Sequence, residues 1–113
     1  MTNQLIGSFI FINQGYGNLS SIYQNNHEPE PFPEIAKKKR DELKLYNPDV
    51  FEGIYEAVWL EPGNHIKAEL TIIKRSDNTY KLEWCNLSPN VIKGFEGLGM
   101  LHDGKLIGHY TEI

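Results

Sequence analysis

The sequence predicts a mainly β chain, an antiparallel meander that forms a barrel or half-barrel, with one helix at about residues 34–46. Short runs within residues 51–113 alternate apolar with polar side chains, which is the pattern of strands with one buried face. The 113 residues include 10 glycines, 6 tyrosines and 5 phenylalanines, a composition that favours strands and tight turns. The length fits one domain, residues 1–113, and 40% hydrophobic with 23% charged residues is typical of a folded globular chain.

The first 24 residues predict an N-terminal hairpin. Leu5–Ile12 is rich in strand-forming residues and apolar on both faces, which indicates a strand that is buried or covered by a partner. The Gly- and Asn-rich segment 13–18 predicts a turn, and Leu19–Gln24 alternates as the second strand. Residues 25–33 carry prolines at every second position from 29, which exclude a helix or a central strand and predict an extended linker.

Residues 34–46 predict the helix. Pro33 suits the first turn of a helix, and the carboxylate of Glu34 favours the positive end of the helix dipole. One face of this helix would carry three apolar side chains, Ile35, Leu43 and Tyr46. The helix would end near Asn47, because the residue before a proline disfavours helical dihedral angles. The basic run 37–40 would then spread around the helix and lie in solvent, rather than form a nucleic-acid or targeting patch.

Five strands are expected in the meander of residues 51–113: Phe51–Leu60, Ile66–Lys74, Thr79–Cys85, Val91–His102 and Lys105–Glu112. Between the second and third of them, a two-residue loop would place Leu70 and Ile72 opposite charged residues. A three-residue loop places both on the face that carries Tyr80, Leu82 and Trp84. We prefer this register because the buried face decides the pairing.

The dipeptide Asp103-Gly104 is the strongest hairpin signal in the chain. As a two-residue loop it pairs Gly97 with Tyr110 and Gly99 with Gly108, so three glycines share one face. These glycines indicate either aromatic side chains that cover a bend in the sheet or a floor against which a ligand lies. We favour the first interpretation, because it is the usual meaning of glycine within strands.

Charge and composition exclude several classes of function. A formal net charge of −4 with only two arginines argues against a nucleic-acid surface. The longest apolar stretch, Leu5–Ile12, is far shorter than the about 20 residues of a membrane-spanning helix, so we expect no membrane partner and a cytoplasmic chain. The single cysteine, Cys85, excludes an internal disulfide and a zinc site built from cysteines.

Catalytic and metal-binding motifs are not found in the sequence. There is no Gly-x-Ser-x-Gly nucleophile motif, and no Gly-x-Gly-x-x-Gly motif opens a helix after a strand. Two of the four histidines, His102 and His109, would share a face but stand roughly 13 Å apart, too far to bind one ion. We therefore expect a protein that is not an enzyme and that uses no cofactor or metal.

Aromatic residues form the strongest candidate set for a binding site. Tyr55 and Trp59 share a face of one expected strand, and Tyr80 and Trp84 share a face of another. Inside a barrel these side chains either fill the interior, which is usual in a small barrel, or line a pocket. The candidate ligand-binding residues are Tyr55, Trp59, Tyr80, Trp84, Gly97, Gly99 and Tyr110.

The spacing of these residues carries a family resemblance. It runs Phe51-x-Gly53-x-Tyr55-x-x-x-Trp59, then Tyr80-x-Leu82-x-Trp84, then Gly94-Phe95-x-Gly97-x-Gly99. The pattern resembles small calycin-like barrels, the lipocalin-type group, and uncharacterised bacterial domains of that style. The resemblance implies that Gly53 and Tyr55 open the barrel and that the meander encloses an apolar cavity for a small hydrophobic molecule. The chain departs from the family because Tyr55 stands where lipocalins carry Trp, no arginine follows Arg75, the helix precedes the meander, and seven strands are expected instead of eight.

These observations predict a non-enzymatic domain that binds a small apolar or aromatic molecule inside the barrel. The alternative is a protein-interaction module, such as an immunity-type protein or a homodimer that completes its sheet with a second chain. A cavity above about 300 Å³ would favour the binder, and a packed interior would favour the module. Leu5–Ile12 has two apolar faces, and the core of the barrel can cover only one of them. The apolar face of the expected helix is too narrow to cover the other. We therefore expect a homodimer that buries this strand.

Overall fold

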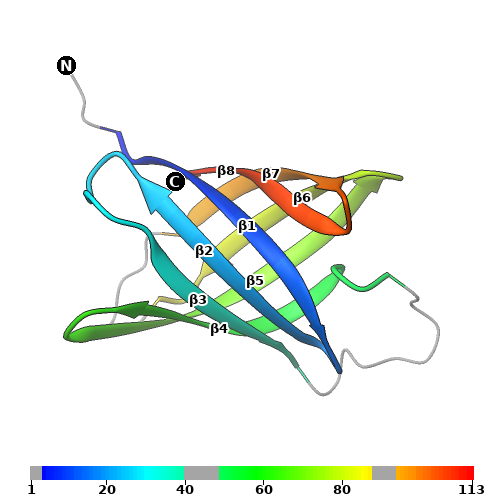
Figure 1. Cartoon of the computed structure of the whole chain (residues 1–113), viewed down its shortest axis with the longest axis horizontal. Helices are drawn as coiled ribbons and strands as arrows, with labels where there is room; N and C mark the ends of the chain where they lie inside the picture. The colour runs from blue at the N-terminus through cyan, green and yellow to red at the C-terminus, as the bar shows by residue number, and fades with distance from the viewer. Residues whose placement is uncertain (1–3, 40–48, 88–93) are drawn as a thin grey trace.

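The computed structural model describes residues 4–39, 49–87 and 94–113. Their eight strands form a closed antiparallel barrel, in which each strand pairs with the next along the chain and β8 pairs with β1 (Figure 1). The strands are β1 (Ile6–Gly15), β2 (Asn18–Asn25), β3 (Phe32–Lys38), β4 (Gly53–Glu61), β5 (Asn64–Ser76), β6 (Thr79–Cys85), β7 (Phe95–His102) and β8 (Lys105–Glu112). The expected antiparallel meander is confirmed, and it closes into a full barrel.

Alternating side chains give the barrel a buried interior and an exposed wall. In β1, Phe9 and Phe11 point inward and are buried, whereas Ile6 and Ile12 point outward and are exposed. The buried positions of β2 are Leu19, Ser21 and Tyr23, again at every second residue. The inward face of the first strand therefore carries Gly7, Phe9 and Phe11, and its outward face carries three isoleucines and Ser8.

The β7–β8 hairpin has the register that its turn residues predict. Asp103 and Gly104 have φ angles of 54° and 75°, the left-handed pair that a two-residue type I′ turn requires. Gly99 then lies opposite Gly108, and Gly97 lies opposite Tyr110.

The β5–β6 hairpin reaches the predicted face by a different route. Leu70 lies opposite Trp84 and Ile72 opposite Leu82, so the preferred inward set is confirmed. The loop itself has two residues, because Ser76 pairs with Thr79. A register shift between Lys74 and Ser76, rather than a longer loop, brings the apolar side chains inside.

The predicted helix is wrong where the structure describes it. Residues 34–38 belong to β3, with Glu34 and Ala36 buried and Ile35 exposed, and residues 40–46 lie outside the described residues. The strand forms because β2 and β4 pair with it on both sides, and these tertiary contacts override a local helical pattern. Pro33 is tolerated because it lies near the first residue of the strand, before the β3–β4 ladder begins at Glu34. In the described parts of the chain, no helix is long and apolar enough to cross a membrane.

β3 also changes the strand count and the role of the linker. Phe32 and Pro33, placed in the linker by sequence, start this strand, and the barrel has eight strands instead of seven. Gly53 and Tyr55 begin the fourth strand of the barrel rather than opening it. Every described strand is paired on both sides, so a dimer that completes an open sheet has no free edge to join.

One end of the barrel interior is filled by aromatic side chains. The ring of Phe51, which precedes β4, packs edge-on against Tyr80 with 6.1 Å between ring centroids. The hydroxyl of Tyr55 donates a hydrogen bond to the backbone carbonyl of Phe51 (2.7 Å), and that of Tyr80 donates to Asp49 Oδ2 (2.7 Å). These hydrogen bonds hold the segment before β4, residues 49–52, against this end of the barrel.

The glycines of the β7–β8 hairpin make room for the Phe9 side chain. A Cβ atom at Gly97 would lie 3.3 Å from the Phe9 ring, and one at Gly108 would lie 2.8 Å from it. A Cβ at Gly99 would lie 2.8 Å from a methyl group of Leu106. The glycine face is therefore covered by protein side chains, which is the interpretation favoured from the sequence.

Candidate ligand-binding pocket

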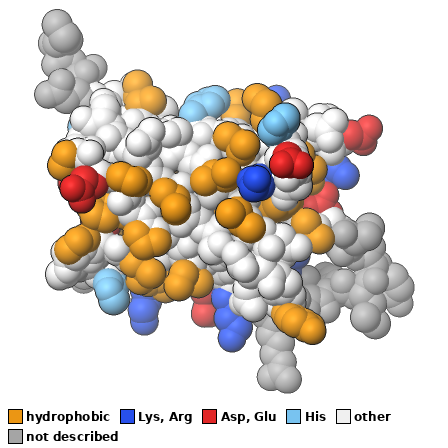
Figure 2. All heavy atoms as spheres, in the orientation of Figure 1, with side chains coloured by type: hydrophobic (Ala, Val, Ile, Leu, Met, Phe, Trp, Pro, Cys, Tyr) orange, Lys and Arg blue, Asp and Glu red, His pale blue; other side chains and the backbone are white. Residues whose placement is uncertain are grey.

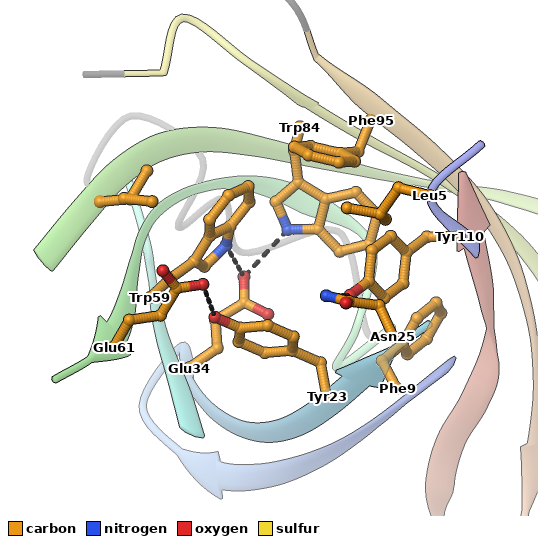
Figure 3. A pocket seen from close by; sticks show the side chains of 11 residues that line it. Leu5, Phe9, Tyr23, Asn25, Glu34, Trp59, Glu61, Trp84, Phe95 and Tyr110 are labelled. Carbon is orange, nitrogen blue, oxygen red and sulfur yellow. Dashed lines mark hydrogen bonds between the residues drawn. The ribbon is translucent and has the colours of Figure 1, made fainter. Parts of the chain in front are cut away.

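The opposite end of the barrel is hollow. It contains a cavity of about 160 Å³, where β1, β3, β5 and β7 begin and the other four strands end. The lining residues are Leu5, Phe9, Tyr23, Asn25, Glu34, Trp59, Glu61, Ile66, Trp84, Phe95 and Tyr110. Figure 3 shows these side chains converging on a common space from the surrounding strands.

Among the described residues of this lining, Glu34 carries the fully buried carboxyl group. Its side chain enters the barrel because β3 alternates, and only 2% of the residue is exposed. The indole N–H groups of Trp59 (3.1 Å) and Trp84 (2.9 Å) both donate to Oε2 of Glu34. Burial raises the pKa of Glu34 to about 7, although the two indole donors stabilise the carboxylate and act in the opposite direction.

The second oxygen of the Glu34 carboxyl group faces the cavity. Figure 3 shows Oε1 turned away from both indoles, toward the space beside Tyr23. Among the described residues, Oε1 accepts no hydrogen bond. A carboxylate offers about four acceptor positions, so the pocket presents an acceptor that the surrounding side chains do not use.

Four aromatic rings form a closed circuit around the cavity. The ring centroids of Tyr23 and Trp59 are 6.1 Å apart, those of Trp59 and Phe95 5.3 Å, those of Phe95 and Tyr110 5.9 Å, and those of Tyr110 and Tyr23 6.3 Å. All four contacts are tilted or edge-on, the geometry that aromatic pairs prefer. Trp84 joins the circuit through Tyr110, at 5.8 Å.

The tyrosine hydroxyl groups of the lining are held by polar partners. Tyr23 donates a hydrogen bond to Glu61 Oε1 (2.8 Å), and Asn25 Nδ2 donates to the hydroxyl of Tyr110 (3.2 Å). Burial raises the pKa of both tyrosines, that of Tyr110 to about 12, so both rings are neutral at physiological pH. In the described part of the chain, the acidic residues of the lining are Glu34 and Glu61, and the lining includes no lysine, arginine or histidine.

The structure divides the candidate residues of the sequence into three groups. Trp59, Trp84 and Tyr110 line the cavity. Tyr55 and Tyr80 lie at the filled end of the barrel, where they bond to the segment before β4. Gly97 and Gly99 face inward, but Phe9 and Leu106 occupy the space above them. The barrel is thus both filled and hollow, at opposite ends.

Sequence reasoning missed Glu34, Tyr23 and Phe95 as pocket residues. The local sequence predicts a helix at Glu34, and a glutamate at an inward position of a strand is rare, so alternation does not predict it. The alternation of β2 and of β7 carried a usable signal for the other two, since Tyr23 and Phe95 share the inward parity of their strands.

The lining supplies few groups for chemistry. Among the described residues, the lining holds no serine, threonine, cysteine, lysine or histidine, and its ionisable groups are the carboxyls of Glu34 and Glu61 and the hydroxyls of Tyr23 and Tyr110. Cys85 lies outside the lining, and burial raises the pKa of its thiol, which disfavours the reactive thiolate. Within residues 4–39, 49–87 and 94–113, no cluster of three His, Cys, Asp or Glu side chains could hold a metal ion. The arrangement can enclose an apolar molecule and accept a hydrogen bond from it.

An eight-stranded, antiparallel, closed barrel is compatible with the calycin-like fold that the sequence resembles. Comparisons with protein-family models, with curated proteins and with solved structures found no match to this chain.

Proposed function

We propose that the protein is a non-enzymatic, calycin-like binder of a small apolar or aromatic molecule, held in the hollow end of the barrel. The observation that carries the proposal is the cavity itself. One end of the interior is packed with side chains, whereas the other leaves about 160 Å³ between aromatic walls. Protein interiors are close-packed, so the side chains around an apolar cavity of this size lack van der Waals contacts on one side. A ligand in the cavity would supply these contacts.

The size of the cavity limits the ligand to a single ring. The volume of about 160 Å³ does not reach the about 300 Å³ that would favour the binder on volume alone and that drug-sized ligands occupy, although this end of the interior is not packed either. It is close to the ~150 Å³ of an engineered apolar cavity that accepts benzene. The expected ligand is therefore smaller than those of most small-molecule sites.

Calorimetric titration with toluene tests this function. The wild-type protein is expected to bind one toluene per chain. Ile66→Trp, which adds a large side chain to the lining, is expected to weaken binding at least tenfold. The matched control is Ile73→Trp, because Ile73 is on the same strand but points outward and is exposed. Absence of binding to the wild type, or equal binding by Ile66→Trp, would contradict the proposal.

A second function is favoured by the outer wall of the barrel. Met100, Ile107, Ile10 and Ile22 lie side by side across β7, β8, β1 and β2. We call these four residues the apolar row. Figure 2 shows hydrophobic side chains spread over the face that contains β1 and β2. We propose that a second copy of the chain covers the apolar row, because the row has no charge and two copies can meet on it without repulsion.

A further inference from the structure

We propose that the ligand is a small organic cation, a single aromatic ring with a protonated amine that donates a hydrogen bond to Oε1 of Glu34. This inference rests on the proposed function and specifies the chemical class of the ligand. It comes from three features of the pocket, namely its acceptor, its charge and its rings.

The acceptor is the first feature. Only 2% of the Glu34 residue is exposed. No described residue donates a hydrogen bond to its Oε1 atom. Oε1 itself is accessible from the cavity: in the described part of the chain, the buried side-chain oxygen without a partner is Ser21 Oγ, not Glu34 Oε1. Both indole N–H groups are already used by Oε2, and the hydroxyl of Tyr23 is used by Glu61. A donor for Oε1 therefore comes from a molecule that enters the cavity, either water or a ligand with an N–H or O–H group.

The charge of the lining is the second feature. Glu34 lies within the pocket, and Glu61 lies in the lining beside Tyr23. The lining residues that the structure describes include no lysine, arginine or histidine that could neutralise the two carboxylates. In surroundings of low dielectric constant, opposite charges attract more strongly than in water, so an ammonium group is favoured there and a carboxylate is repelled.

The aromatic circuit is the third feature. Tyr23, Trp59, Phe95 and Tyr110 surround the space with ring centroids 5.3 to 6.3 Å from their neighbours. A cation is attracted to the electron-rich faces of such rings, and aromatic enclosures of this kind recognise ammonium groups. The same rings supply apolar contact for the ring of the ligand.

Protonation of Glu34 links binding to pH. Burial raises its pKa to about 7, so the empty pocket holds a carboxyl that exchanges its proton near neutrality. An ammonium group favours the ionised form, so binding below pH 7 should release a proton from Glu34 and affinity should rise as the pH increases toward 7. The other titratable groups facing the cavity are Tyr23 on β2, Glu61 on β4 and Tyr110 on β8. The tyrosines stay neutral in this range, and Glu61→Gln serves as the control for the second carboxylate.

Calorimetry with benzylamine, toluene and benzoate at pH 7.5 tests the inference. The three probes share one ring and differ in charge. Benzylamine is expected to bind the wild type at least tenfold more tightly than toluene, and benzoate is expected not to bind. Glu34→Gln is expected to bring benzylamine to within about threefold of toluene, whereas Glu61→Gln should keep most of the preference. The glutamine amide oxygen can still accept from both indoles, and circular dichroism checks that this variant is folded.

The results separate the two proposals. If none of the probes binds, the proposed function fails. If toluene binds but benzylamine binds no better, the cavity is a binding site and the cation inference is wrong. A preference for benzylamine that persists in folded Glu34→Gln would also overturn it. If Glu34→Gln does not fold, the wild type alone still tests the inference. Benzylamine binding is then measured at pH 6 in buffers of different ionisation enthalpy, and the binding heats must show release of a proton.

Discussion

Glu34 has opposite effects on binding and on stability. Its carboxyl group is buried among apolar rings, and only one of its oxygens is hydrogen-bonded by described residues. Folding raises its pKa from 4.5 to about 7, so the folded state binds this proton more tightly than the unfolded state. The free energy of unfolding should therefore fall as the pH rises from 4.5 to about 7, by at most about 3 kcal/mol in total. Above pH 7 this contribution should not change further.

The pH dependence of Glu34→Gln tests this cost. The free energy of unfolding of both proteins is measured with denaturant at pH 5 and at pH 8. Between these pH values the wild type should lose more stability than Glu34→Gln does. Glutamine does not ionise, so the variant should be the more stable protein at pH 8, by an amount on the order of 1–3 kcal/mol. Parallel stability curves for the two proteins would show that Glu34 does not titrate between these values.

At the scale of elements, the β7–β8 hairpin depends on glycines that no other residue can replace equally. A Cβ at Gly108 would lie 2.0 Å from the backbone oxygen of Leu98, and 2.7 Å from the Cα of Gly99. Backbone atoms on both sides cannot move without disturbing the ladder. At Gly99 the nearest atom is a methyl group at the end of the Leu106 side chain, which can rotate away.

We expect Gly108→Ala to destabilise the protein by about 1–3 kcal/mol through overpacking against the backbone. Gly99→Ala is the matched control in the same hairpin and should cost less, because its clash is with a flexible side chain. Thermal unfolding of both variants checks the order. Equal melting temperatures would mean that the hairpin relaxes around either methyl group.

Elements with strong local signals could be predicted from the sequence, and β3 could not. Asp103-Gly104 determines its own hairpin, because both turn residues tolerate positive φ and the register follows from the two-residue loop. In residues 34–38 the local evidence favours a helix, whereas the strand is formed by pairing with β2 and β4, which no local pattern encodes. The error at β3 also concealed the candidate site, since Glu34 reaches the pocket only if this segment is a strand.

For the aromatic residues, the sequence predicted an inward face but not the end of the barrel that each residue occupies. Tyr55 and Trp59 share a face of β4 and are four residues apart, so they lie at different heights in the barrel. The segment before β4 fills the interior beside Tyr55 and Tyr80, while nothing comparable among the described residues fills the space beside Trp59 and Trp84. This difference depends on long-range packing.

At the scale of the whole molecule, closure removes sheet edges and leaves the outer wall as the surface for assembly. Ile22 is 55% exposed and Met100 60% exposed, and both belong to the apolar row that crosses four strands. The three outward isoleucines of β1 are stabilised by a partner that removes them from water.

Sedimentation at low micromolar concentration tests the dimer. The wild type is expected to sediment as a dimer and Ile10→Glu as a folded monomer, because the new charge would lie in the middle of the apolar row. Ile73→Glu places the same charge on the exposed face of β5 and should leave the dimer intact. A monomeric wild type would mean that the apolar row is not an interface between copies of this chain.

Nuclear magnetic resonance of the two indole N–H groups tests directly whether the hollow end of the barrel binds a ligand. The chain contains two tryptophans, and both indoles line the cavity and donate to Glu34, so their signals report on the pocket. Titration with toluene at pH 7.5 should shift both indole signals in a saturable manner, at one ligand per chain. If both signals stay unchanged with toluene near its solubility limit and also with benzylamine, while the protein remains folded, the hollow end of the barrel is not a ligand-binding site.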